Sequence, residues 1–248
     1  MRQERVILSG MTIVLFATAV FVSCKKNSND PPPDLIKTAN IQAVNAAAKS
    51  GEFEVQVGDK KIANTIKYLN QPDAYTSFTT KNDVTIQITG ANNTVVAKGT
   101  HTLDDKQNYS LFIYDTLDAG KKVKYVLLKD NFPAVAAGKT NIRFLHLSPD
   151  MPAVDIDLFK GNDSVRLISA NSYIGGTPDA KVLSARNTVV PSGNYLVKVK
   201  TKTGTVINTL LTIPSLQLAS GKTVTLYLRG LKKGTAGSES GLQLLLHK

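Results

Sequence analysis

The stretch Val154-Asp155-Ile156-Asp157-Leu158 alternates apolar and polar residues. Successive side chains of a β-strand point to opposite faces, so this alternation predicts a strand with one buried face. The same pattern recurs at Phe53–Val57, Val84–Ile88, Tyr195–Lys200 and Val224–Leu228. Turn-forming Gly, Asn, Asp and Pro residues separate such stretches at intervals of roughly 8 to 15 residues, which is typical of sandwiches and barrels. The sequence therefore predicts an all-β protein.

The composition narrows the class of protein further. Of the 248 residues, 42% are hydrophobic, 20% charged and 6% aromatic, which is typical of a soluble globular protein and argues against a coiled coil, a membrane channel or a disordered chain. The single Cys excludes a disulfide framework and a cysteine-based zinc cluster, and the three His are scattered. The sequence contains no phosphate-binding loop or dinucleotide-binding fingerprint. We therefore expect neither a metal nor a cofactor.

The N-terminal residues 1–23 are typical of an export signal. Two Arg residues precede the apolar run Val6–Val22, as in the basic and hydrophobic regions of a signal peptide. The run leads into Ser23-Cys24, which resembles the lipobox read by the bacterial lipoprotein signal peptidase. Cys24 is therefore the expected lipidation site, and its acyl chains would anchor the protein to a membrane.

Residues 24–38 are expected to form a flexible tether behind the lipid. Three consecutive prolines, Pro31–Pro33, favour an extended spacer and exclude a helix or a central strand. Lys25 follows the lipidated position, and the absence of Asp there favours the outer membrane. We therefore expect a lipid-anchored, outer-membrane protein of the cell envelope, facing either the periplasm or the outside.

The rest of the chain contains a loose internal repeat. Asn40–Val44 opens a first half and Asn141–Leu145 a second, and near its end each half has a turn followed by a strand with an aromatic residue. A segment with Pro and Gly but without alternation, 131–139, separates the halves. We expect two tandem immunoglobulin-like antiparallel β-sandwich domains, at residues 39–138 and 139–248, behind the signal peptide and the Pro-rich tether.

The segment Arg143–Asp155 reads RFLHLSPDMPAVD. It resembles the signature R-F-x-H-x-S-P-D-x-P-A-V-D of the bacterial family called domain of unknown function 4397, whose Bacteroidota lipoproteins commonly carry tandem copies. In the first half, Ala43–Ala46 stands where the His-x-Ser-Pro-Asp element would be. The resemblance implies an all-β fold and an envelope location, and it carries no established activity. The polar residues of this signature, which are our candidate functional residues, are Arg143, His146, Ser148, Asp150 and Asp155.

Three residues of the signature suggest a hydrolase as one alternative. On an extended strand His146 and Ser148 would share a face, and Asp150 or Asp155 could complete a set of nucleophile, base and acid. However, Pro149 holds Ser148 extended, and no Gly-rich element nearby offers an oxyanion hole. In the interpretation that we favour, Ser148 and Asp150 cap turn amides while His146 is satisfied at the sheet edge. We therefore expect no catalytic residues and no enzymatic activity.

The carboxylates of Asp155 and Asp157 would share one face of a strand, and with Asp150 or Asp163 they could begin a calcium site. Calcium prefers six to eight oxygen ligands, and two aligned acids on a strand are usually its solvated side. We therefore expect no metal at this position.

Positive charge is concentrated in the second half. Residues 139–248 contain 14 basic and 6 acidic residues, against 11 and 10 in residues 39–138. An exported protein is not expected to bind nucleic acid, so a basic face suggests an anionic lipid or an acidic glycan as partner. The alternative is a solvated face on which Lys discourages aggregation. The candidate basic face comprises Lys198, Lys200, Lys202, Lys232 and Lys233.

The expected function is that of a non-catalytic envelope lipoprotein acting as a binding, adhesion or structural module. Its partner would be a glycan, an anionic lipid or another envelope protein. Carbohydrate recognition is the alternative within binding, but the chain has no Trp, so Tyr68, Tyr75 and Tyr173 would have to stack on the sugar. A hydrolase built on the signature residues is the less favoured alternative.

Overall fold

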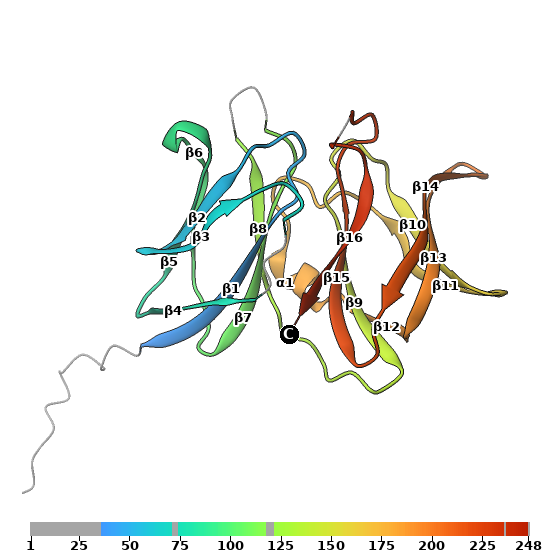
Figure 1. Ribbon diagram of the computed structural model, residues 1–248, viewed down its shortest axis with the longest axis horizontal. Coiled ribbons are helices and arrows are strands. Elements are labelled where there is room, and N and C mark those ends of the chain that lie inside the picture. The colour runs from blue at the N-terminus through green and yellow to red at the C-terminus, as the bar shows by residue number, and fades with distance from the viewer. Residues whose placement is uncertain (1–35, 71–73, 118–121, 236, 248) are drawn as a thin grey trace, which may run out of the picture. The chain divides into compact units, whose positions relative to one another are not determined.

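A computed structural model of the chain describes residues 36–70, 74–117, 122–235 and 237–247. These residues lie almost entirely in strands and their connections (Figure 1), so the predicted all-β fold is confirmed. The predicted signal peptide, Cys24 and most of the tether fall outside the described residues. In the part of the chain that is described, no helix has the length and hydrophobicity of a membrane span.

The first sandwich consists of two four-stranded sheets, in the orders β4-β1-β7-β8 and β3-β2-β5-β6. Its strands are β1 (Lys37–Asn45), β2 (Phe53–Val57), β3 (Lys60–Ile66), β4 (Thr76–Thr80), β5 (Val84–Thr89), β6 (Val95–His101), β7 (Gln107–Tyr114) and β8 (Lys124–Lys129). A 3₁₀ turn at Ala91–Asn93 joins β5 to β6. Strand β1 is parallel to β7, and the other pairs in these sheets are antiparallel.

The second sandwich repeats this arrangement, with the sheet orders β12-β9-β15-β16 and β11-β10-β13-β14. Its elements are β9 (Lys139–His146), β10 (Val154–Lys160), β11 (Asp163–Asn171), α1 (Ala180–Ala185), β12 (Thr188–Pro191), β13 (Gly193–Thr203), β14 (Val206–Leu218), β15 (Lys222–Arg229) and β16 (Gly241–His247). Adding eight to each strand number of the first sandwich reproduces the strand orders of the second. The one parallel pair recurs as β9 with β15. The prediction of two β-sandwiches is confirmed, with one parallel pair in each.

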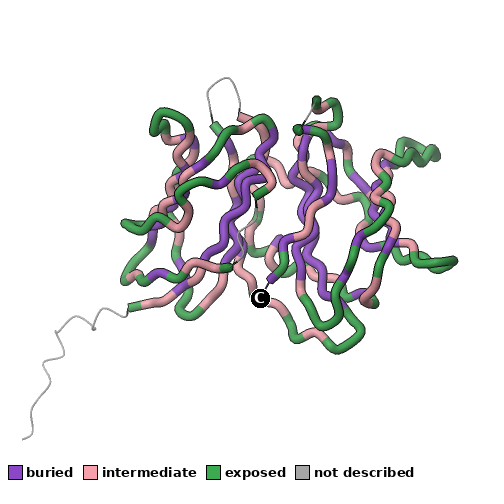
Figure 2. The backbone as a smooth tube through the Cα atoms, in the orientation of Figure 1, coloured by how far each residue is buried: buried purple, intermediate pink, exposed green. Residues whose placement is uncertain are grey.

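Alternating side chains build the core of each sandwich. In β2, Phe53, Val55 and Val57 are buried in the first core, while the residues between them are only half-buried. In β13, Val197 and Val199 are buried in the second core in the same way. Figure 2 shows this as buried segments that alternate with more exposed ones along these strands. The period of two in the sequence therefore follows from sheets with one buried and one open face.

A third apolar cluster joins the two sandwiches. Its larger members are Val44, Phe112, Tyr114, Val126 and Leu128 from the first sandwich, and Leu145, Leu147, Tyr227 and Leu245 from the second. The rings of Phe112 and Tyr227 meet edge to face, with their centroids 5.5 Å apart. Because this cluster covers their outer faces, β1, β7 and β9 are buried on both sides and lack clear alternation. Residues 35–248 accordingly form one compact unit.

Helix α1 covers the edge strand β8. Asp179 caps the helix, because its side chain accepts the backbone N–H of Val182 at 3.0 Å. Ser184 of the helix accepts the backbone N–H of Lys129 in β8, also at 3.0 Å. This contact satisfies a donor on an otherwise open sheet edge. Six residues are too few to show a helical period, so the sequence pattern does not predict this helix.

Candidate functional site

Two side chains of the segment Arg143–Asp155 form hydrogen bonds that connect the loop after β9 to the loop after β15. The buried Ser148 donates its hydroxyl to the carbonyl oxygen of Gly230 at 2.6 Å. Asp150 Oδ1 accepts the backbone N–H of Lys232 at 2.8 Å. Because both bonds end on backbone atoms, they fix the two loops relative to each other.

His146 lies in the same segment and has a different partner. Its Nε2 is 3.0 Å from the carbonyl oxygen of Pro152, so this nitrogen carries the proton and donates it. Burial lowers the pKa of His146, which keeps the ring neutral near pH 7. The ring packs edge-on against Tyr173, with centroids 6.3 Å apart. Within the described residues no hydrogen bond joins His146 to Ser148 or Asp150, so the imidazole is not placed to take the serine proton.

The two carboxylates of β10 are paired with cations. Asp155 accepts the backbone N–H of Ala170 at 2.7 Å and lies 3.1 Å from the guanidinium group of Arg166. Asp157 binds Arg166 at 2.6 Å and Lys200 at 2.8 Å. Burial alone would raise the pKa of Asp157, but the hydrogen bonds from Arg166 and Lys200 outweigh it and lower the pKa. Among the described residues, no three acidic, His or Cys side chains are grouped to hold a metal ion.

Three of the candidate lysines lie on one face of β13. Lys198, Lys200 and Lys202 alternate with core-facing side chains such as Val197 and therefore point away from the core. The ammonium groups of Lys198 and Lys200 lie 5.2 and 5.4 Å from the centre of the Phe159 ring. This geometry gives a favourable cation–π contact at a partly exposed site. The face thus combines cations with an aromatic ring.

The other two candidate lysines lie elsewhere. Lys232 lines a shallow depression of about 570 Å³ together with Thr201 and Thr203, which point to the opposite face of β13. Lys233 is the exposed neighbour of Lys232. The expectation of a single basic face is therefore corrected for Lys232, because the loop after β15 places it on the other side of the β13–β14 hairpin from Lys198, Lys200 and Lys202.

The three tyrosines considered for sugar stacking are half-buried and separate. Tyr75 and Tyr173 each donate their hydroxyl to a carboxylate, of Asp130 and Asp115 respectively, at 2.9 Å. The ring of Tyr68 lies 5.9 Å from a guanidinium group. Sugar stacking needs an exposed aromatic face. These tyrosines contact internal partners and do not form such a platform together.

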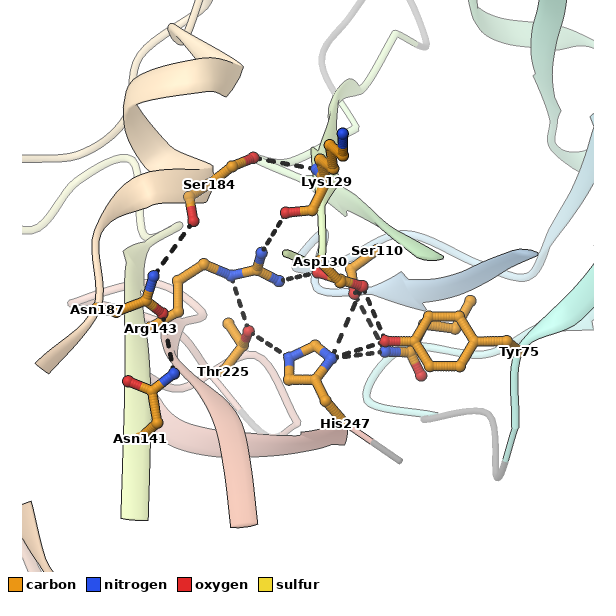
Figure 3. Close-up of polar contacts among 11 residues, drawn as sticks. Tyr75, Ser110, Lys129, Asp130, Asn141, Arg143, Ser184, Asn187, Thr225 and His247 are labelled. Atoms are coloured by element: carbon orange, nitrogen blue, oxygen red, sulfur yellow. Dashed lines mark hydrogen bonds and ion pairs between the residues drawn. The ribbon is translucent and has the colours of Figure 1, made fainter. Parts of the chain in front are cut away.

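A buried polar network lies between the sandwiches and includes Arg143 of the signature (Figure 3). Arg143 Nη2 lies 2.8 Å from Asp130 Oδ1, and the two side chains are 0% and 1% exposed. Arg143 Nε donates to the hydroxyl of Thr225 at 3.0 Å, and the guanidinium group lies 4.9 Å from the ring centre of Phe132. Ser110 donates to the second carboxylate oxygen of Asp130 at 2.6 Å. Such additional bonds are what a buried ion pair needs to offset its loss of hydration.

His247 extends this network and is neutral. Its Nδ1 lies 3.1 Å from Nε2 of Gln42 and 2.9 Å from the hydroxyl oxygen of Tyr75. Nε2 lies 2.8 Å from the hydroxyl oxygen of Thr225. Burial, assisted by the nearby charge of Arg143, lowers the pKa of His247 to about 3. The charge of Asp130 is therefore balanced by Arg143 and not by His247.

The network uses equivalent positions of the two sandwiches. Gln42 lies opposite Ser110 in the pair β1–β7, and Arg143 lies opposite Thr225 in the pair β9–β15. Within each pair the longer side chain donates to the hydroxyl, at 3.1 Å from Gln42 and at 3.0 Å from Arg143. Strand numbering and register therefore make Gln42 the counterpart of Arg143, and Ser110 the counterpart of Thr225.

The same equivalence holds for the groups that cross between the sandwiches. In β8, the partner of Ser110 is Leu128, which lies two positions before Asp130. In β16, the partner of Thr225 is Leu245, which lies two positions before His247. Asp130 and His247 are therefore counterparts. Exchanging the two sandwiches therefore converts the Arg143–Asp130 contact into the Gln42–His247 contact, as in a two-fold symmetric dimer. The two crossing contacts that are related in this way are Arg143 with Asp130 and Gln42 with His247.

Most of this network has no local signal in the sequence. Gln42 and His247 are 205 positions apart, and Asp130 adjoins the segment that separates the two halves. Arg143 alone among these residues was marked by a motif. The signal that could have found the others is the internal repeat, because it aligns Gln42 with Arg143 once the halves are superposed.

Comparison with solved structures and family models gives distant matches. The chain is similar to a leucine-rich repeat protein from Bacteroides thetaiotaomicron at 11% identity, covering 77% of this chain and 25% of that one, with a TM-score of 0.20. It is also similar to a "putative cell adhesion protein" from Bacteroides fragilis at 8% identity, covering 86% and 98%, with a TM-score of 0.22. The chain thus spans about a quarter of the length of the first of these proteins. No curated protein matches it. Residues 39–157 match the model of a family described as a domain of unknown function (DUF4397), and this match covers the first sandwich except its first two residues, as well as the whole signature segment.

Proposed function

We propose that this chain is a non-catalytic, lipid-anchored protein of the cell envelope, whose two sandwiches form one rigid module for binding. The observation that carries the proposal is that the signature side chains serve the architecture. A serine nucleophile needs a base that takes its proton. Ser148 instead donates to the carbonyl of Gly230, and His146 donates to the carbonyl of Pro152. These groups stabilise loops, which leaves the outer surface of the module for recognition.

The contacts between the sandwiches support the rigidity of the module. The apolar cluster and the Arg143–Asp130 pair remove both charged and apolar surface from water at the same interface. Breaking the interface would expose both, so the sandwiches are expected to move together. The repeated strand order supports the further proposal that both sandwiches are copies of one family domain.

The lipid anchor is the part of the proposal that rests on sequence alone. If Cys24 carries the acyl chains, the protein should incorporate labelled palmitate and float with membranes, and Cys24→Ala should lose both properties. Fractionation of inner from outer membranes tests the predicted outer-membrane location. A Cys24→Ala chain that keeps its palmitate label would contradict the lipobox interpretation.

The absence of catalysis is tested at Ser148. A fluorophosphonate probe labels serine nucleophiles that an adjacent base activates, and we expect no labelling of the folded chain. Labelling of the parent chain that disappears in Ser148→Ala, while both proteins keep the same circular dichroism spectrum, would refute the proposal. His146→Gln serves as a second variant, since it would abolish a true base but leave an unactivated serine unchanged.

A further inference from the structure

The hairpin β13–β14 extends beyond the sheet to which it belongs. Strand β10 pairs with β13 as far as Asp155 opposite Lys200. Past this point β13 and β14 continue to pair with each other for three further positions, which end with Thr203 opposite Val206. We call residues 201–208 the arm.

Among the described residues of the first sandwich, the equivalent hairpin does not extend in this way. There the corresponding strand pair ends with Glu54 opposite Thr89, and the hairpin β5–β6 turns directly afterwards, with Thr89 already opposite Val95. The sandwiches also differ in charge, since residues 139–248 hold 14 basic and 6 acidic residues and residues 39–138 hold 11 and 10. Because the two sandwiches share strand order and interface positions, we infer that the arm and the excess of positive charge serve a role that only the second sandwich has.

The arm carries exposed apolar side chains at its tip. Val206 and Ile207 are each 57% exposed, and all residues from 202 to 209 are exposed. Figure 2 shows the end of this hairpin as a continuous exposed stretch. Neighbouring residues of a strand point to opposite faces, so Val206 and Ile207 project from the two sides of the arm. Together they form a narrow apolar wedge.

Lysines lie behind this wedge on both sides. Lys202 is directly opposite Ile207 in the hairpin, and directly paired residues share a face of the sheet. Lys198 continues that face towards the body of the sandwich, next to Lys200, which is paired with Asp157. On the other face, Lys232 lines the depression beside the threonines of the arm. A tip of two apolar side chains is thus followed by cations on either side.

We propose that the arm contacts an anionic lipid surface, with Val206 and Ile207 entering the boundary between headgroups and acyl chains and the lysines binding headgroup phosphates. The proposal deepens the proposed function by naming a partner for the second sandwich, and it relies on that function for the envelope location. Apolar side chains at the membrane boundary, flanked by Lys that reach anionic headgroups, are the two contributions that drive interfacial binding.

The geometry favours a lipid surface over a protein partner. A protein that docked on one face of the arm would meet Ile207 and Lys202, or Val206 and Lys232, but not both sets. A planar surface across the tip can meet all four at once. The apolar residues also form a projecting tip and not a groove, and a tip inserts into a fluid layer without needing a complementary pocket.

The chain contains no Trp, so a single introduced Trp reports its own surroundings. The Ile207→Trp chain, purified with its acyl group, is bound to vesicles of phosphatidylcholine alone or mixed with phosphatidylglycerol. We expect a blue-shifted emission and quenching by brominated acyl chains only with phosphatidylglycerol, and both effects should decline with added salt. The control is Val189→Trp, at a 54% exposed position of β12, which should keep an aqueous emission.

Further variants separate charge from anchoring. Lys202→Gln should lower the phosphatidylglycerol-dependent affinity about fivefold, whereas Lys222→Gln, at an exposed site on another sheet, should not change it. Flotation with vesicles of phosphatidylcholine alone reports whether the acyl anchor binds membranes. The Trp emission with phosphatidylglycerol reports whether the arm does, so the two proposals can fail independently. An unshifted emission of Ile207→Trp with phosphatidylglycerol, or an equal shift of Val189→Trp, would overturn the proposal. A shift caused by envelope protein extract and not by vesicles would assign the arm to a protein partner.

Discussion

Replacing Arg143 by Met should separate the contribution of the buried ion pair from that of the apolar interface. The Asp130 carboxylate is 1% exposed and would lose its counter-charge, keeping the hydroxyl groups of Ser110 and Tyr75 as donors. Removing one partner of a buried pair destabilises a protein by about 3–5 kcal/mol, because the other charge remains without hydration. We therefore expect Arg143→Met to lower the free energy of unfolding by about that amount, a change of roughly 100- to 4000-fold in the folding equilibrium.

The measurement is urea unfolding at pH 7, followed by far-ultraviolet circular dichroism and by tyrosine fluorescence. Adding Asp130→Asn to Arg143→Met removes the stranded charge while keeping an acceptor for Ser110, so the double variant should recover about 2 kcal/mol or more. Arg166→Met is the control, since the side chain of Arg166 is 48% exposed and its loss should change stability far less. The reasoning is refuted if Arg143→Met is no less stable than Arg166→Met, or if the double variant is no more stable than Arg143→Met.

Three further changes probe the network and the loops. The pKa of His247 is lowered to about 3 in the folded chain, so the free energy of unfolding should be unaffected above pH 6.5. It should fall by up to roughly 5 kcal/mol as the pH drops towards 3, because the unfolded chain then binds a proton that the folded chain does not. His247→Gln should remove this part of the acid sensitivity, as measured by urea titrations at several pH values. Ser148→Ala leaves the carbonyl of Gly230 without its donor and should cost about 1–3 kcal/mol in thermal unfolding; an unchanged midpoint would mean that the carbonyl finds another donor. Gly230→Ala should lower the stability more than Gly58→Ala. Both glycines have positive φ, but a Cβ at Gly230 overlaps the carbonyl oxygen of Glu239, whereas Gly58 faces open space. Equal losses of stability would contradict this close approach.

The strands that could be predicted are those with one open face. Val154–Leu158 falls within β10, and the predicted stretch Phe53–Val57 coincides with β2. In both strands core-facing residues alternate with residues that keep contact with solvent or with cations, which produces a period of two in the sequence. Strands β1 and β9 lack this alternation because both of their faces are buried, and their equivalence was visible only as the loose repeat of Asn40–Val44 and Asn141–Leu145.

The candidate site could be predicted less completely, because its partners are set by tertiary contacts. Alternation on β13 was enough to place Lys198, Lys200 and Lys202 on one face. The position of Lys232 depends on a loop whose path follows from the Asp150 hydrogen bond to its backbone, and no sequence period describes that path. The motif marked Arg143 but could not indicate Asp130, since an ion pair leaves no pattern in the chain when its partners come from different sheets.

The two crossing contacts differ in charge although their positions are equivalent, and this difference specifies which sandwiches pair. If two first sandwiches met through this face, Gln42 would lie against Asp130 twice, which would bury two carboxylates without a counter-charge. If two second sandwiches met, Arg143 would lie against the neutral His247 twice, which would bury two guanidinium groups without one. Only the pairing of a first with a second sandwich balances every buried charge, and each mismatch is penalised by unpaired charge in a desolvated interface. Replacing Gln42 by Arg together with His247 by Asp should therefore make the two contacts alike and permit pairing between like sandwiches, which analytical ultracentrifugation would detect as a larger fraction of oligomers than in the parent chain.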